Sequence, residues 1–170
     1  MHMNINFGNI NLKQSDKVPD EILEIARSDE LAPLLTEKWQ YPKPMPDSID
    51  FTIYDADEVI GQASFKSIRW FNRKAELSLF IKPGHQGRKL GQKILEAMIG
   101  YAFGKLNFYR LEAEVIEYNE KALKLVEKLG FTMEGRLRKA KYSGGKYCDI
   151  LRYGILKHEF DAFYKDGGQP

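Results

Sequence analysis

A turn rich in glycine and cations stands between an apolar strand and an apolar helix in the stretch FIKPGHQGRKLGQKIL, residues 80–95. Gly87 and Gly91 carry no Cβ, so the main chain there can approach a ligand closely. Arg88 and Lys89 add positive charge between the two glycines. The first N–H groups of a helix lack intrahelical partners, and the helix dipole favours an anion there. The pattern therefore predicts either a pyrophosphate-binding turn or a plain tight turn with a solvated basic face.

A second basic segment is RLRKAKYSGGK, residues 136–146, which holds five cations and no acid. The formal net charge of the whole chain is only +2, too small to indicate nucleic-acid binding by itself. Charge runs usually face water, so a solvated hairpin is one interpretation. The other is an electropositive rim that steers an anionic ligand. We do not expect nucleic acid as a partner.

The composition is that of one globular domain. The chain has 170 residues, 43% of them hydrophobic and 29% charged, enough to bury a core. The single cysteine, Cys148, excludes an internal disulfide and a cysteine-based zinc site, and we expect no metal. No apolar run approaches the roughly 20 residues of a membrane span, and the polar start MHMNINFGN does not resemble a signal peptide. We expect a cytoplasmic protein without membrane contact.

Hydrophobic periodicity and turn residues predict a mixed α/β domain with one central sheet. Three antiparallel strands precede the glycine turn, and the last two strands form a hairpin around Ser143-Gly144-Gly145. The remaining segment, 157–170, is expected to be a fraying tail. In chain order, the expected elements are a strand within 4–14, a helix from Pro19, strands at 50–55, 59–68 and 75–81, a helix at 89–106, a strand at 109–119, a helix from Asn119 to Leu129, and two strands within 131–156.

Two segments resemble the GNAT acetyltransferase superfamily. In GHQGRKLG, Gln86 and Gly91 match the first and last positions of that family's Q/R-x-x-G-x-G/A loop, whereas Lys89 stands at its middle glycine. The second segment, NEKALKLVEKLGFTMEGRLR from Asn119, is similar to the ribosomal-protein, polyamine and amino-sugar acetyltransferase branch. The resemblance covers roughly residues 50–156.

This resemblance implies the GNAT fold, a mostly antiparallel, splayed sheet of about seven strands flanked by about four helices. It also implies a single domain over residues 1–170. Within that domain, 1–50 would supply a strand, a helix and an acceptor-side loop, 51–156 the acetyl-CoA-binding core and the C-terminal hairpin, and 157–170 a tail.

The resemblance further implies acetyl-CoA as co-substrate. The strand at 78–81 would pair with the pantetheine arm, the glycine turn would hold the pyrophosphate, and Asn119 would hydrogen-bond the arm near the thioester. Lys124 or Lys128 would reach the phosphates. The cofactor-binding residues expected on this basis are Ser78, Leu79, Phe80, Ile81, Gln86, Gly87, Arg88, Lys89, Leu90, Gly91, Gln92, Asn119 and Lys124.

For catalysis, the resemblance implies a general base that removes a proton from the acceptor ammonium. Glu76 is our first candidate and Glu114 the second. Many GNAT enzymes carry a tyrosine on the second helix that acts as the general acid and protonates the departing CoA thiolate. This chain has Val126 at that position. Tyr142, Tyr147 or Cys148 would be the substitutes from the hairpin, or else ordinary packing residues.

Two functions follow from the resemblance. The first is transfer of an acetyl group to a primary amine, which is a protein N-terminus, an amino sugar or a small molecule. The alternative is a catalytically weak or inactive CoA-binding module that acts as a sensor or partner, and a homodimer is compatible with both. The basic hairpin suits an anionic acceptor better than a polyamine. Trp39, Tyr41, Trp70 and Phe71 line the acceptor site or belong to the core.

Overall fold

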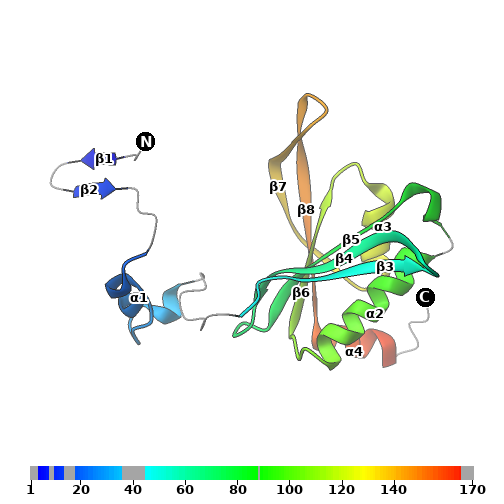
Figure 1. Ribbon diagram of the computed structural model, residues 1–170, viewed down its shortest axis with the longest axis horizontal. Coiled ribbons are helices and arrows are strands. Elements are labelled where there is room, and N and C mark those ends of the chain that lie inside the picture. Colours follow the sequence, from blue (N-terminus) through cyan, green and yellow to red (C-terminus); the bar gives the residue numbers. More distant parts are fainter. Residues whose placement is uncertain (1–3, 8–9, 14–17, 36–44, 88, 166–170) are drawn as a thin grey trace. The chain divides into compact units, whose positions relative to one another are not determined.

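The computed structural model describes residues 4–7, 10–13, 18–35, 45–87 and 89–165. The chain divides into two compact units, Met1–Lys43 and Pro44–Pro170. Figure 1 labels the elements of both units.

The first unit contains a two-stranded antiparallel sheet and one helix. Strands β1 (Asn4–Phe7) and β2 (Ile10–Lys13) pair, with Phe7 opposite Ile10. The prediction of one strand over this stretch is therefore wrong, because its residues form two short strands that pair with each other. Helix α1 (Asp20–Ala26) begins after Pro19 with two acids in its first turn, as expected, and a 3₁₀ turn follows at Ala32–Leu34.

The second unit is built on a six-stranded sheet with the strand order β3-β4-β5-β6-β8-β7. The predicted fold class is confirmed, although the central sheet has six strands among the described residues, not seven, since the N-terminal strands pair with each other. Its strands are β3 (Ile49–Asp55), β4 (Glu58–Arg69), β5 (Lys74–Ile81), β6 (Arg110–Ile116), β7 (Thr132–Ser143) and β8 (Lys146–Leu156).

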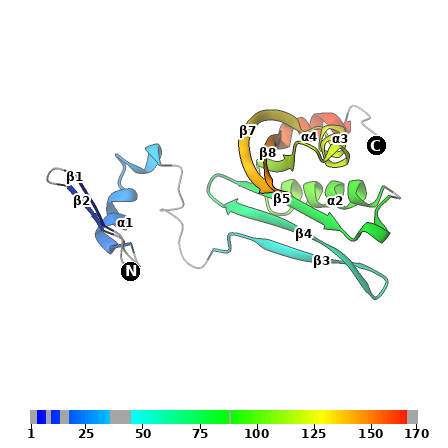
Figure 2. The same cartoon turned by 90° about the horizontal axis from the view of Figure 1, so that it is seen from above.

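Three helices cover one face of this sheet, α2 (Leu90–Gly104), α3 (Glu120–Lys128) and α4 (Lys157–Lys165) (Figure 2). Apolar residues of α2 and α3 repeat at three- and four-residue steps and pack on the alternate, buried residues of β4, β5 and β6. The core includes Phe65, Leu77, Ile99, Leu111 and Val126.

Helix α4 corrects the expectation of a fraying tail over 157–165. Its Phe160 packs against the core, with its ring 5.4 Å from that of Phe103 on α2. The carboxylate of Glu159 accepts a hydrogen bond from the Leu156 N–H at 2.8 Å. The apolar residues of this short segment therefore form a docking face. No helix in the described part of the chain is long and apolar enough to cross a bilayer.

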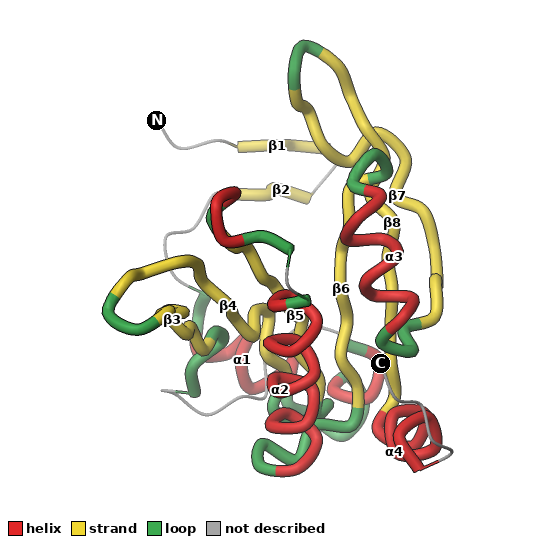
Figure 3. The backbone as a smooth tube through the Cα atoms, turned by 90° about the vertical axis from the view of Figure 1, so that its right-hand side faces the viewer, coloured by secondary structure: helices red, strands yellow, loops and turns green. Residues whose placement is uncertain are grey.

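The geometry of the candidate site depends on how β5 pairs with β6. Figure 3 shows β6 between β5 and the β7–β8 pair. These two strands run parallel and pair only from Lys74 opposite Arg110 to Glu76 opposite Glu112. β5 continues to Ile81 and β6 to Ile116 without further pairing to each other. The sheet is therefore splayed at this point, as predicted, and both strands leave main-chain groups free for a ligand.

Candidate active site

The splay between β5 and β6 opens a cavity of about 200 Å³. Its walls come from both strands and from the helices beneath them. The residues that line it are Glu76, Leu77, Ser78, Leu79, Leu95, Ala113, Glu114, Val115, Asn119, Ala122, Leu125, Val126 and Phe131. The cavity is thus mostly apolar, with two carboxylates at strand positions.

A second cavity of about 370 Å³ shares four lining residues with the first, Leu79, Asn119, Ala122 and Leu125. Its other lining residues are Ile81, Gln86, Gly87, Lys89, Gly91, Gln92 and Lys121. The two cavities together form one groove. It runs from the glycine turn, Lys89 and Lys121 to the carboxylates of Glu76 and Glu114 on the splayed strands.

The glycine turn adopts a left-handed backbone at two positions. Gly87 has a φ of +95°, and Lys89, directly before α2, has a φ of 56°. This geometry explains why a glycine is expected at position 89, since a left-handed conformation costs a residue with a Cβ on the order of 1 kcal/mol. No atom outside the neighbouring residues lies within 4 Å of a Cβ built on Gly87, so the turn is open there. Arg88 lies outside the described residues.

Glu76 is a half-buried carboxyl at the point where the splay begins. Burial, followed by the negative charge of Glu114, raises the pKa of Glu76 above its ordinary value, and the positive charge of Lys66 offsets only part of this. Among the described residues it has no hydrogen-bond or ion-pair partner. A carboxyl with a raised pKa in a cavity is a suitable proton acceptor at neutral pH.

Glu114 lines the same cavity but is already paired. Its Oε1 lies 3.1 Å from Nε of Arg152, on the neighbouring strand β8. The guanidinium therefore occupies one oxygen of the Glu114 carboxylate. The geometry therefore favours Glu76 over Glu114 as the base.

Asn119 joins the two cavities. Its Oδ1 accepts a hydrogen bond from the Ala122 N–H at 3.2 Å, so it is the N-cap of α3, as predicted. Its main-chain N–H donates to the carbonyl of Ile116 at 2.9 Å, which closes the turn between β6 and α3. The cap bond leaves the side-chain NH₂ group free to donate to a ligand in the groove.

Not every expected site residue reaches the groove. Phe80, Leu90 and Lys124 are not among the described residues that line it, and Phe80 is 63% exposed. Lys124 faces Glu120 at 4.0 Å on the helix surface. Gln92 does line the groove, but its amide donates to Glu96 and accepts from Lys128, which binds the two helices together.

The expected substitutes for a proton-donating tyrosine also lie elsewhere. Tyr142 and Tyr147 pack against each other near the hairpin turn with their rings tilted, and each is 64% exposed. Cys148 is buried and is not among the described residues lining either cavity. These residues are not positioned to protonate a leaving group in the groove.

The aromatic residues expected near the acceptor site have mixed outcomes. Trp70 packs against the core, with its ring 5.6 Å from that of Phe108. Phe71 is 58% exposed. Trp39 and Tyr41 lie outside the described residues, as does the first half of the proline loop at 41–48.

The sequence interpretation missed part of the helical wall of the groove. Ala122 and Leu125 line both cavities, and Lys121 adds a cation beside the glycine turn. Ala122 stands three residues after Asn119 and Leu125 three residues after Ala122, which places both on the cavity side of α3, so helical periodicity could have identified them.

Comparisons with known proteins show the family of the chain. The family described as Acetyltransferase (GNAT) domain matches residues 15–151. Spermidine N(1)-acetyltransferase of Escherichia coli K12 is 33% identical over 119 residues, which are 70% of this chain and 64% of that protein. The putative ribosomal N-acetyltransferase YdaF of Bacillus subtilis is 30% identical over 65% of this chain and 60% of its own length.

Solved structures show the same fold. A mutant form of the spermidine/spermine N-acetyltransferase SpeG of Vibrio cholerae superposes with a TM-score of 0.66 at 30% identity, covering 69% of this chain and 71% of that one. The chain spans about 64% of the length of the curated E. coli relative. With the family match over most of its residues, the chain belongs to the GNAT acetyltransferase family.

Proposed function

We propose that this protein is an acetyl-CoA-dependent N-acetyltransferase that transfers the acetyl group directly to a primary amine. The observation that carries the proposal is the position of Glu76. This carboxyl has a raised pKa and no hydrogen-bond or ion-pair partner within the described part of the chain, and it lies in the splay between β5 and β6, in a groove continuous with the glycine turn.

The groove suits acetyl-CoA along its whole length. Main-chain groups on the β6-facing edge of β5 beyond Glu76 pair with no residue of β6 and are available to the pantetheine amides as an added strand. Gly87, Lys89 and Lys121 offer open backbone and positive charge to the pyrophosphate at the other end. The apolar cavity near Val126 would hold the thioester.

The reaction needs a neutral amine, and the chain provides a base for it. With an alkylamine pKa near 10, the neutral form costs roughly 4 kcal/mol at pH 7. Glu76 takes a proton from the ammonium, directly or through a water. The amine nitrogen then bonds to the acetyl carbon while the carbon–sulfur bond breaks and its electron pair leaves with sulfur, and the new amide nitrogen gives up its surplus proton to the thiolate or to solvent.

The thiolate leaves without a tyrosine acid. No tyrosine or cysteine is among the described residues that line the groove, and Val126 occupies the position on α3. For a thiol of pKa about 8.5, departure as the anion at pH 7 costs only about 2 kcal/mol. The proton held by Glu76 can return to sulfur or to solvent.

The acceptor class within the primary amines is open to direct screening. Relatives are named for spermidine and for ribosomal protein, and these acceptors head a panel that also includes amino sugars and their phosphorylated forms. A homo-oligomer is part of the same proposal, since one V. cholerae relative is dodecameric. Sedimentation of the full chain tests that point.

Isothermal titration with acetyl-CoA, combined with a thiol-release assay over the amine panel, tests the proposal. We expect saturable binding and turnover of at least one amine. Binding without turnover of any amine would favour the alternative, a CoA-binding module without catalysis. No binding of acetyl-CoA would overturn both functions.

A further inference from the structure

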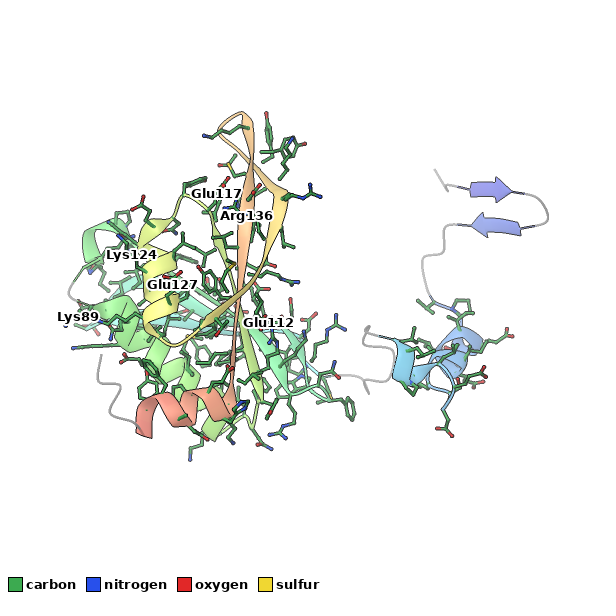
Figure 4. The ribbon with its side chains drawn as sticks, turned by 180° about the vertical axis from the view of Figure 1, so that it is seen from behind. Lys89, Glu112, Glu117, Lys124, Glu127 and Arg136 are labelled. Carbon is green, nitrogen blue, oxygen red and sulfur yellow. The ribbon has the colours of Figure 1, made fainter. Side chains whose placement is uncertain are left out.

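A second set of charged side chains lies outside the groove, where the β6–α3 turn meets the β7–β8 hairpin. It consists of Glu117, Arg136 and Asp149, and Figure 4 shows Glu117 and Arg136 close together beside the hairpin. Nη1 of Arg136 donates to Oδ2 of Asp149 at 3.0 Å and lies 3.9 Å from Oε2 of Glu117. None of the three is among the described residues that line either cavity.

Asp149 fixes an irregularity in the hairpin. The pairing of β7 with β8 shifts register between Leu137 and Lys141, and Lys139 within this bulge has a φ of 51°. The Lys139 N–H donates to Oδ1 of Asp149 at 2.8 Å. A left-handed lysine persists only where its surroundings hold it, and a bulge changes the direction of the strand beyond it. The Asp149 carboxylate therefore sets the direction of the end of the hairpin.

The main chain of Asp149 holds the β6–α3 turn as well. Its N–H donates to Oε1 of Glu117 at 2.9 Å, and its carbonyl accepts the Glu117 N–H at 3.1 Å. These bonds extend the β6–β8 pairing by one residue beyond Ile116 opposite Ile150. Asn119, which lines both cavities, stands two residues after Glu117 in the same turn.

We propose that Glu117 and Asp149 are positioning residues that fix the Asn119 turn and the hairpin bulge to each other. Through them, the acyl-donor groove and the basic hairpin keep one relative placement during acetyl transfer. The inference rests on the proposed function, because the inference takes Asn119 as part of the acetyl-CoA site and the hairpin as part of the site for the acceptor amine.

The first test is the affinity for CoA, measured by isothermal titration without any turnover. Glu117→Ala removes the acceptor for the Asp149 N–H, and we expect CoA to bind about threefold to tenfold more weakly, the scale of coupling within a contacting network. Glu120→Ala is the matched control, since it removes a carboxylate from the same region that has no contact with Asp149. Equal affinities of Glu117→Ala and the wild type would overturn the proposal.

The second test is a rescue at the bulge, read in steady-state kinetics. Asp149→Ala should raise the KM for the amine with a smaller change in kcat. Adding Lys139→Gly should restore the KM, because glycine adopts the left-handed backbone without help from a carboxylate. Failure of the double variant to recover would overturn the role of Asp149 at the bulge.

Two further measurements distinguish failure of the inference from a variant that does not fold and from failure of the proposed function. If Glu117→Ala does not fold, Glu117→Asp takes its place, because its shorter side chain withdraws the carboxylate from the Asp149 N–H. The readout is amide hydrogen exchange over residues 116–122, and we expect faster exchange there than in the wild type. Unchanged exchange would contradict the proposal. A wild-type protein that does not bind CoA would overturn the proposed function and this inference together, whereas a binding wild type with an unaffected Glu117→Ala overturns the inference alone.

Discussion

A glutamate carboxyl has opposite surroundings in the paired half and in the splayed half of β5 and β6. In the paired half, Glu112 accepts hydrogen bonds from Lys74 and Arg110, both at 2.8 Å. Burial alone would raise the pKa of Glu112, but these two cations outweigh it and lower the pKa. At the start of the splay, Glu76 has no such partner among the described residues, and burial raises its pKa.

The difference separates a carboxylate held by two cations from the one that we propose as the base. Arg110 also binds Glu134 on β7 through both terminal nitrogens, so the paired half is held by a network that spans three elements. That network links β5, β6 and β7 through their charged side chains. Glu76 instead has its carboxyl at a mostly apolar cavity with no such cation bonded to it in the part of the chain that the structure describes, an arrangement that costs stability and that fits the proposed proton transfer.

The strongest way to break the comparison is Glu76→Gln. We expect kcat/KM to fall by about 10²- to 10⁴-fold, the usual contribution of a general base, while the affinity for acetyl-CoA stays unchanged. The midpoint of thermal unfolding should stay equal or rise, because a carboxyl whose pKa is raised in the folded state loses stability as pH rises through that pKa. Thiol-release kinetics and calorimetry measure both.

Glu114→Gln is the matched control for this variant. It removes a carboxylate from the same cavity, but one already paired with Arg152. We expect a fall in kcat/KM of less than about tenfold, since this group is not the proton acceptor. A larger loss in Glu114→Gln than in Glu76→Gln would reverse the assignment of the base.

Glu112→Gln should produce the opposite pattern. Loss of two charge-assisted hydrogen bonds should lower the free energy of unfolding by about 2 kcal/mol at pH 7, with kcat/KM little changed. Since the pKa of Glu112 is lowered in the folded state, its contribution is present above the ordinary pKa and is lost as pH falls through the lowered one. Denaturant unfolding at pH 7 and pH 3 should show the difference from wild type shrinking at low pH. An equal difference at both pH values would contradict this account of Glu112.

Lys89→Gly should give the smallest effect, at the far end of the groove. Glycine adopts the φ of 56° without strain, so we expect the free energy of unfolding to rise by roughly 1 kcal/mol. The affinity for acetyl-CoA should stay equal or rise if the main chain does the binding. A complete loss of affinity in this variant would show that the Lys89 ammonium itself contacts phosphate.

Most of the second unit could be predicted from the sequence because its signals are local. The alternation in 75–81, the Asn119 cap, the Gly144-Gly145 turn and the apolar repeat of α2 each report on a few neighbouring residues. The same holds for the glycine turn, and the family resemblance placed Glu76 and Asn119 in one site.

The remainder depends on contacts between distant residues, which a single sequence does not display. The ion pair of Glu114 with Arg152 and the pairing of Glu112 with Lys74 each join residues 38 apart in the chain. The sequence therefore named two candidate glutamates. In the structure Glu114 is paired with Arg152, whereas Glu76 has no partner among the described residues. Helix α4 was missed because its apolar residues acquire a packing partner only when the chain returns to α2.

The pH dependence of kcat/KM for thiol release, in the wild type and in Glu76→Gln, tests the assignment of the base most directly. The wild-type rate should rise with pH through one ionisation above the ordinary glutamate pKa, because burial raises the pKa of Glu76 and only its charged form accepts a proton. That ionisation should disappear in Glu76→Gln while titration shows acetyl-CoA still bound. A variant that keeps both the wild-type rate and the same ionisation would contradict the account.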